Sequence, residues 1–306
     1  MIKYMRRWRK DYELLLLCVP ALILILILKY LPMFGITIAF MDFKPSLGFF
    51  KSPWVGFKNF EFFFRNQDIW IVLRNTLGYN FAFIIIGNFV SLSFAIMMNE
   101  ITKRKLVKFY QTTLFFPYFL SWTVVAYIVL AFLDPTSGIL NGVYHAFGTK
   151  QPSWYTTPSV WPPIFILLNS WKNVGASSII YYAAIMGIDG EYYEAALLDG
   201  ANKFQVITKI TIPLLKPIIT MLVILSIGSI LYSDFGLFYV VTNQLGQGLL
   251  NSSGQVIDTY VYNALLKIGD VGMSSAIGLV QSCVGFILVM ITNFIVKKVS
   301  PDNSLF

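Results

Sequence analysis

Long apolar segments alternate with polar ones along the 306 residues, and this alternation constrains the fold more than any other feature. A helix needs about 20 predominantly apolar residues to cross a bilayer. Charged residues make up 12% of the sequence, against about 25% in soluble domains. The sequence therefore predicts an all-α integral membrane protein with six transmembrane helices. The predicted spans cover residues 14–41, 73–98, 112–133, 160–187, 217–241 and 276–296.

The first apolar segment follows a basic N-terminus, as in a signal peptide, but no A-x-A-like cleavage site follows it and apolar character resumes at Tyr30. We therefore expect a retained span and a single transmembrane domain over residues 14–300, with tails at 1–13 and 301–306. Residues 59–70 fit either an interfacial helix or an ordinary packed loop helix. Residues 258–267, DTYVYNALLK, predict a short surface helix.

The positions of the basic residues predict the orientation. Five Lys or Arg lie in the first ten residues, four between Lys103 and Lys108, three between Lys203 and Lys216, and two at Lys297 and Lys298. Loops rich in Lys and Arg stay on the cytoplasmic side. Both termini and the loop 188–216 are therefore expected in the cytoplasm.

The loop 188–216 has the features of two short helices joined by a sharp turn. Asp189 is a suitable N-cap, and the carboxylates of Glu191 and Glu194 suit the positive end of a helix dipole. Gly200 can adopt a positive φ, and Pro213 is expected to end the second helix. Ala195 and Ala196 allow another surface to approach the backbone closely. The loop is thus predicted to be a docking element.

This loop resembles the EAA loop in the membrane subunits of binding-protein-dependent ABC importers. The family pattern is Glu-Ala-Ala, three residues, Gly, nine residues and Ile-x-Leu-Pro, and the sequence departs from it only at Ile212. The resemblance implies the type I importer permease (MetI-like) fold, with cytoplasmic coupling helices that a separate ATPase grips. The residues that it assigns to ATPase coupling are Glu191, Glu194, Ala195, Ala196, Leu197, Asp199, Gly200, Ala201, Ile210 and Pro213.

Further stretches resemble LplB-type permeases of importers for polysaccharides and complex oligosaccharides. They are YLPMFGITIAFMDF, WKNVGASSIIYYAAIMGIDGEYYEAALLDGA and VIDTYVYNALLKIGDVGMSSAIGLVQS. This resemblance implies a subunit of a bacterial plasma-membrane importer. Its expected partners are a second, related permease in a heterodimer, two ATPase subunits, and an extracellular solute-binding lipoprotein that delivers an oligosaccharide.

The sequence lacks the motifs that are typical of nucleotide-binding, metal and catalytic sites. There is no GxxxxGK[ST], HExxH, CxxC or G-x-S-x-G pattern, and the single histidine is His145. Cys18 and Cys283 lie in apolar runs and indicate packing rather than a metal site. We therefore expect a non-catalytic chain with no metal, cofactor or nucleic-acid site. The resemblance to importer permeases implies that ATP and Mg²⁺ are bound by the partner ATPase.

Two charged residues fall inside predicted spans, where charges are costly and mark functional candidates. Lys172 and Asp234 are expected at similar heights, about 22 and 25 Å from the cytoplasmic ends at about 1.5 Å per residue. They either pair with each other or contact a polar substrate. The alternative is an ion pair or a snorkelling lysine that only fixes helix packing. The other predicted lining residues are Asn169, Asn173, Ser177, Ser229, Tyr232 and Gln281.

An ion-coupled secondary transporter of a polar solute is the alternative function. That class predicts inverted repeats with paired broken helices and a site for a coupling ion. The sequence contains no second copy of the docking pattern, and one Lys with one Asp is a sparse ion site.

Overall fold

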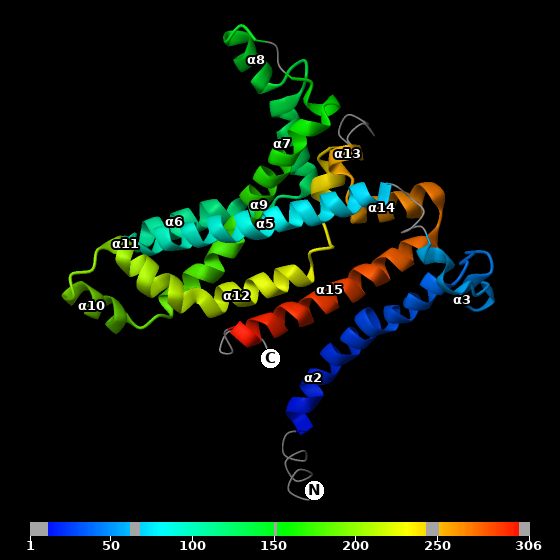
Figure 1. Ribbon diagram of the computed structural model, residues 1–306, viewed down its shortest axis with the longest axis horizontal. Helices are drawn as coiled ribbons and strands as arrows, with labels where there is room; N and C mark the ends of the chain where they lie inside the picture. The colour runs from blue at the N-terminus through cyan, green and yellow to red at the C-terminus, as the bar shows by residue number, and fades with distance from the viewer. Residues whose placement is uncertain (1–11, 62–67, 150–151, 243–250, 300–306) are drawn as a thin grey trace, which may run out of the picture. The chain divides into compact units, whose positions relative to one another are not determined.

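The computed structural model describes residues 12–61, 68–149, 152–242 and 251–299, and all of the elements named within them are helices (Figure 1). The all-α prediction is therefore confirmed for the described residues. Most of the predicted tail 1–13, the whole of 301–306 and residues 62–67 lie outside them. The chain divides into two compact units, which comprise residues 1–66 with 263–280 and residues 67–262 with 281–306.

The first unit contains the first apolar helix, which runs through α2 (Tyr12–Ile25), η1 (Leu26–Tyr30) and η2 (Leu31–Phe40). Its 25 residues from Leu16 to Phe40 are long and apolar enough to cross a membrane. The amide of Asn59 donates to the carbonyls of Ala39 and Met41, so a side chain satisfies the end of this helix. The remaining elements of this unit are α3 (Gly48–Lys51), η3 (Gly56–Phe60), η11 (Ala264–Ile268) and the start of α15 (Val271–Val299).

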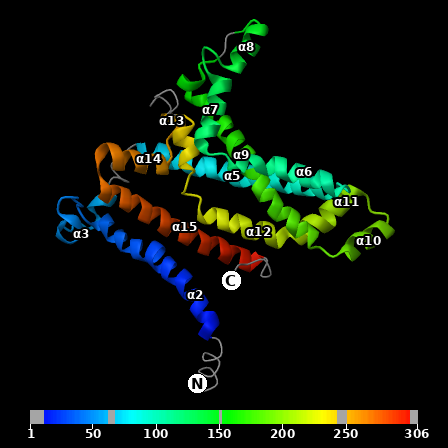
Figure 2. The ribbon, with the colours of Figure 1, turned by 180° about the vertical axis from the view of Figure 1, so that it is seen from behind.

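The second unit is organised around the two long helices α5 (Asp68–Asn99) and α9 (Trp161–Met186), which pack along each other (Figures 1 and 2). Helix α6 (Arg104–Phe115) lies beside α9, where a Cβ on Gly175 would come within 1.9 Å of the carbonyl oxygen of Leu114. Helices α12 (Ile212–Gly228) and α15 also meet at glycines, because a Cβ on Gly285 would lie 2.4 Å from the oxygen of Gly228. Such glycine contacts allow close backbone packing between membrane helices.

The remaining elements of this unit are shorter. They are η4 (Phe116–Phe119), α7 (Trp122–Leu133), α8 (Ile139–Ala146), η5 (Trp154–Thr156), η6 (Pro158–Val160), α10 (Gly190–Leu198), α11 (Lys203–Val206), η7 (Ile207–Thr211), η8 (Gly236–Val240), α13 (Asn251–Gly254) and α14 (Ile257–Asn263). Residues 258–267 are helical as predicted, in α14 and η11, but Thr259 and Ala264 are buried, so the helix does not lie wholly at the surface. An aromatic cluster around Tyr79, Phe165 and Phe238 forms the largest buried core of this unit.

Four described helices are long and apolar enough to cross a membrane, or five if one bent pair counts as a single span. The four cover Leu16–Phe40, Asp68–Asn99, Lys203–Gly228 and Val271–Lys298. Helix α9 coincides with the remaining predicted span, 160–187, and is long enough at 26 residues. It is less apolar than the four helices above, because it carries Lys172 and several Asn and Ser residues.

The third predicted span, 112–133, is sharply bent. Its helix stops at Phe119 and restarts at Trp122, and the two parts differ in direction by 97°. Pro117 lies in the last turn before the bend, and Ser121 caps the new helix by accepting a hydrogen bond from the Val124 N–H.

The fifth predicted span, 217–241, has different limits in the structure. A continuous helix runs from Lys203 to Gly228, and the chain then leaves helical geometry until Phe235. Pro213 and Pro217 both lie inside this helix. A π-helical segment precedes Pro213, and such local adjustments supply partners for backbone groups that a proline leaves free. Asp234 therefore lies beyond the helix, and its height cannot be derived from the helical rise.

The contact between α6 and α9 generates a stability prediction. Gly175→Ala should lower the free energy of unfolding by about 1–3 kcal/mol, because the new methyl group forces the two backbones apart. Gly78→Ala is the matched control, since Gly78 lies in helix α5 with nothing within 4 Å of its Cβ position. Thermal unfolding of the detergent-solubilised protein measures both variants. Equal unfolding temperatures for the two variants would contradict the close packing.

Candidate functional site

The loop 188–216 forms the predicted helix–turn–helix. Helix α10 is capped by Asp189, whose carboxylate accepts a hydrogen bond from the Glu191 N–H at 3.1 Å. Gly200 adopts a φ of +75°, in the left-handed region that favours glycine. The cap and the glycine turn are therefore confirmed.

The second arm of the loop differs from the prediction. Asn202 and Gln205 form a capping box at the start of α11, and the helix then continues through η7 into α12 without a break. Pro213 was expected to end this arm, but it lies in the first turn of α12. The second docking helix is thus the beginning of an apolar helix that spans 26 residues.

Two contacts tie the loop together and fix it to the helices beside it. The Tyr193 and Thr211 hydroxyl oxygens lie 3.3 Å apart and join α10 to η7. The Lys203 ammonium pairs with the Glu100 carboxylate, next to the end of α5, at 2.6 Å. The second pair is solvent-exposed, so it contributes little to stability.

A concave surface of about 800 Å³ lies between the two arms of the loop. Seven residues predicted to contact an ATPase line it, whereas Glu194, Leu197 and Pro213 lie outside the lining set. Leu197 and Leu198 are 68% and 89% exposed. The lining residues are Asp189, Glu191, Tyr192, Ala195, Ala196, Asp199, Gly200, Ala201, Gln205, Lys209 and Ile210.

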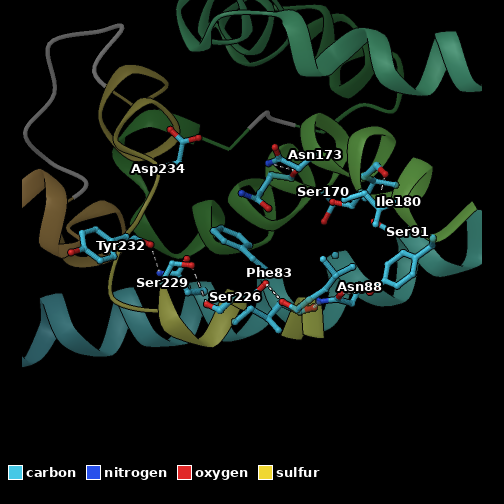
Figure 3. A pocket seen from close by; sticks show the side chains of 18 residues that line it. Phe83, Asn88, Ser91, Ser170, Asn173, Ile180, Ser226, Ser229, Tyr232 and Asp234 are labelled. Carbon is cyan, nitrogen blue, oxygen red and sulfur yellow. Dashed lines mark hydrogen bonds between the residues drawn. The ribbon is translucent and has the colours of Figure 1, made fainter. Parts of the chain in front are cut away.

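A second hollow, of about 450 Å³, lies among α5, α9 and α12 (Figure 3). It contains six of the eight predicted pathway residues, whereas Lys172 and Gln281 are not part of its lining. The lining residues are Asn80, Phe83, Ile84, Gly87, Asn88, Ser91, Asn169, Ser170, Asn173, Val174, Ser177, Ile180, Tyr181, Leu222, Ser226, Ser229, Tyr232 and Asp234. Amides, hydroxyls and aromatic rings thus surround the hollow, which we call the polar cavity.

Lys172 faces away from this cavity, toward the bend between η4 and α7. Its ammonium donates to the carbonyls of Pro117 and Tyr118, at 3.4 and 3.0 Å, and to that of Leu120. It also lies over the rings of Tyr118 and Trp122, and Lys172 is only 8% exposed. A bend leaves helical carbonyls without partners, and the ammonium supplies three donors. Lys172 therefore holds the bend in the third span.

Asp234 lies in the segment 229–235, which is non-helical as far as Asp234, and is exposed at one end of the polar cavity. Its carboxylate accepts hydrogen bonds from Trp122 Nε1 at 2.6 Å and from the Gly236 N–H at 3.0 Å. Asp234 and Lys172 thus have separate hydrogen-bond partners, although the two charges attract each other. A direct pairing of the two, which was one of the predicted alternatives, is absent from the described contacts.

Side chains from three helices hold the segment 229–235. Asn80 donates to the carbonyls of Ile230 and Tyr232, and Gln281 donates to that of Leu231. The Asp258 carboxylate accepts a hydrogen bond from the Ser233 N–H. Burial raises the pKa of Asp258, and this effect is larger than the lowering of the pKa by that hydrogen bond. Backbone groups at membrane depth need such partners in place of water. Gln281 was predicted as a lining residue, and instead it supports this segment.

The sequence interpretation missed Asn80, Trp122 and Asp258. Asn80 lies in an apolar helix and Trp122 at a helix start, so neither stands out by residue type. The hydrogen-bond partners of Asn80 and Trp122 lie more than 100 positions away in the chain. A signal was nevertheless present in the run of polar residues from Ser229 to Asp234, which interrupts an apolar segment.

Residues 84–301 match a family described as the binding-protein-dependent transport system inner membrane component. The chain belongs to this family. The match contains the coupling loop, the bend partner Lys172 and most of the polar cavity. The chain is accordingly a permease with the MetI-like fold, as its resemblance implied.

Relatives along the whole chain support this membership. Protein LplB of Bacillus subtilis is 38% identical over 99% of this chain and 94% of its own length. The polygalacturonan/rhamnogalacturonan transport system permease protein YteP of the same species is 36% identical over 95% of this chain and 89% of its own length. The crystal structure of a bacterial ABC transporter involved in the import of the acidic polysaccharide alginate has a similar chain, with a TM-score of 0.86, 30% identity, and coverage of 97% and 99%.

The environment of Lys172 predicts the effect of removing its charge. Lys172→Met keeps an apolar stem but leaves three carbonyls without their donor, so we expect a loss of about 3 kcal/mol in the free energy of unfolding. Lys216→Met, at an exposed position on α12, is the control and should have little effect. Thermal unfolding in detergent measures both.

A double exchange distinguishes two roles of Lys172: donation to the three carbonyls, which we call the carbonyl clamp, and an ion pair with Asp234. In the double exchange Lys172→Asp with Asp234→Lys, an aspartate cannot donate to carbonyls, so stability should stay low. Recovery of the wild-type unfolding temperature by the double exchange would contradict the clamp.

Proposed function

We propose that this chain is one of two related permease subunits in a bacterial ABC importer and forms half of the pathway for a complex oligosaccharide. An extracellular solute-binding lipoprotein delivers the glycan, and two separate ATPase subunits supply the energy. The glycan assignment is supported by the names of the relatives and by the amide, hydroxyl and aromatic lining of the polar cavity. A related structure of the alginate transporter includes an alginate pentasaccharide-bound periplasmic protein, with a TM-score of 0.85 and 29% identity.

The observation that carries the mechanism is the continuous helix from Lys203 to Gly228. Its 26 residues extend about 39 Å at 1.5 Å per residue. One end is the docking arm of the coupling loop, and the other end meets the segment 229–235 beside the polar cavity. A rigid element with both functions at its ends transmits a movement at one site to the other.

In this mechanism the chain contributes no catalytic group of its own. An ATPase surface occupies the concave face of the coupling loop, and nucleotide-driven closure of the two ATPases moves the loop. The helix then displaces the segment 229–235 and exposes the polar cavity to one side of the membrane after the other. The proposed orientation has both termini and the coupling loop in the cytoplasm, where ATP is present.

The coupling role predicts the effect of two substitutions in the loop. In proteoliposomes that contain both permeases and the ATPases, Gly200→Asp or Glu194→Lys should abolish most of the ATP hydrolysis stimulated by the glycan-loaded binding protein. Gly200→Asp strains a left-handed turn and adds a charge to the concave face.

Gly269→Asp is the matched control, because Gly269 has a φ of +76° but lies outside the coupling loop. It introduces the same backbone strain and should leave stimulated hydrolysis largely intact. Normal stimulation in both loop variants would contradict the docking role. Uptake that needs no ATP and follows an ion gradient would contradict the importer.

A further inference from the structure

The charges around the polar cavity carry an inference about the glycan, which rests on the proposed function. Among the described residues that line the cavity, Asp234 is the one with a charged side chain at neutral pH. The rest of its polar surface comes from four asparagines, five serines and two tyrosines. This lining can bind sugar hydroxyls, but it presents no ammonium or guanidinium group to a sugar carboxylate.

The nearest cation is directed elsewhere. Lys172 has its ammonium on three backbone carbonyls and two aromatic rings, and it is absent from the cavity lining. Asp234 attracts this ammonium and lies on the cavity side of it. The field that the buried lysine would project into the cavity is therefore offset by the carboxylate.

Asp234 is fixed in this position by the surrounding structure. Trp122 Nε1 and the Gly236 N–H hold one carboxylate oxygen each, and Asn80 and Gln281 hold the backbone that precedes it. A fixed carboxylate repels a second carboxylate that comes close to it. It still accepts hydrogen bonds from hydroxyl groups, because each oxygen has a second lone pair.

We propose that the wall contributed by this chain takes an uncharged stretch of glycan and disfavours uronate residues, with Asp234 as the specificity-determining residue. The relative with the alginate structure imports an acidic polysaccharide. The proposal therefore distinguishes this chain from that transporter by the charge of its substrate.

The test uses two ligands of the same length and linkage, tetragalacturonate and its carboxyl-reduced counterpart, in which an uncharged hydroxymethyl group replaces each carboxylate. Binding of each to the purified heterodimer of permeases with its ATPases is measured by calorimetry without the binding protein, whose own selectivity then plays no part. The wild type should bind the reduced ligand more tightly. Asp234→Asn should improve uronate binding relative to the reduced ligand on the order of tenfold, the effect of one unit charge at about 10 Å and an effective dielectric constant of about 20.

Two further variants keep the outcome interpretable. Asp234→Glu retains the charge and should retain the preference, and Ser226→Ala removes an uncharged lining group and should change both affinities alike. A wild type that binds the uronate at least as tightly, or an unchanged affinity ratio in Asp234→Asn, would overturn the proposal. Binding of neither ligand would overturn it too. The assignment of the chain to an importer is tested separately, by the stimulated ATP hydrolysis.

Discussion

The fold depends on satisfying backbone groups at two interruptions of apolar helices. Water is absent from the hydrocarbon core, so each free carbonyl or N–H needs a partner from the protein. At the first interruption Lys172 donates to carbonyls of residues 117–120, and at the second Asn80 and Gln281 donate to carbonyls of residues 230–232. Trp122 and Asp234 connect the two interruptions directly. One polar network therefore joins both breaks, and the second of them lines the cavity.

This network relates the cavity to the coupling loop. The helix from Lys203 to Gly228 starts at the capping box and ends at the second interruption, so no flexible joint separates the docking arm from the cavity wall. At the other end, Tyr193 contacts Thr211 between the two arms of the loop, and Lys203 pairs with Glu100 next to the end of α5. The two prolines within this helix are compatible with continuity because a π-helical segment accommodates Pro213.

Local patterns predicted some of these features, whereas others depend on contacts distant in the sequence. The cap at Asp189 and the positive φ of Gly200 follow from residue type and spacing, and the structure confirms both. The role of Lys172 was not predictable, because its partners are backbone carbonyls, which every residue carries. The limits of the fifth span were misjudged for a related reason: Gly228 ends the helix where Asn80, about 150 positions earlier, holds the unwound chain.

Access to the coupling loop tests the central claim most directly. A single cysteine at Leu198, 89% exposed on α10, is introduced after Cys18 and Cys283 are replaced by serine, and a membrane-impermeant maleimide is applied to vesicles of both orientations. The mechanism predicts labelling in inside-out vesicles and protection from labelling when the ATPase subunits are bound. Labelling only in right-side-out vesicles, or labelling that the ATPase leaves unchanged, would contradict it.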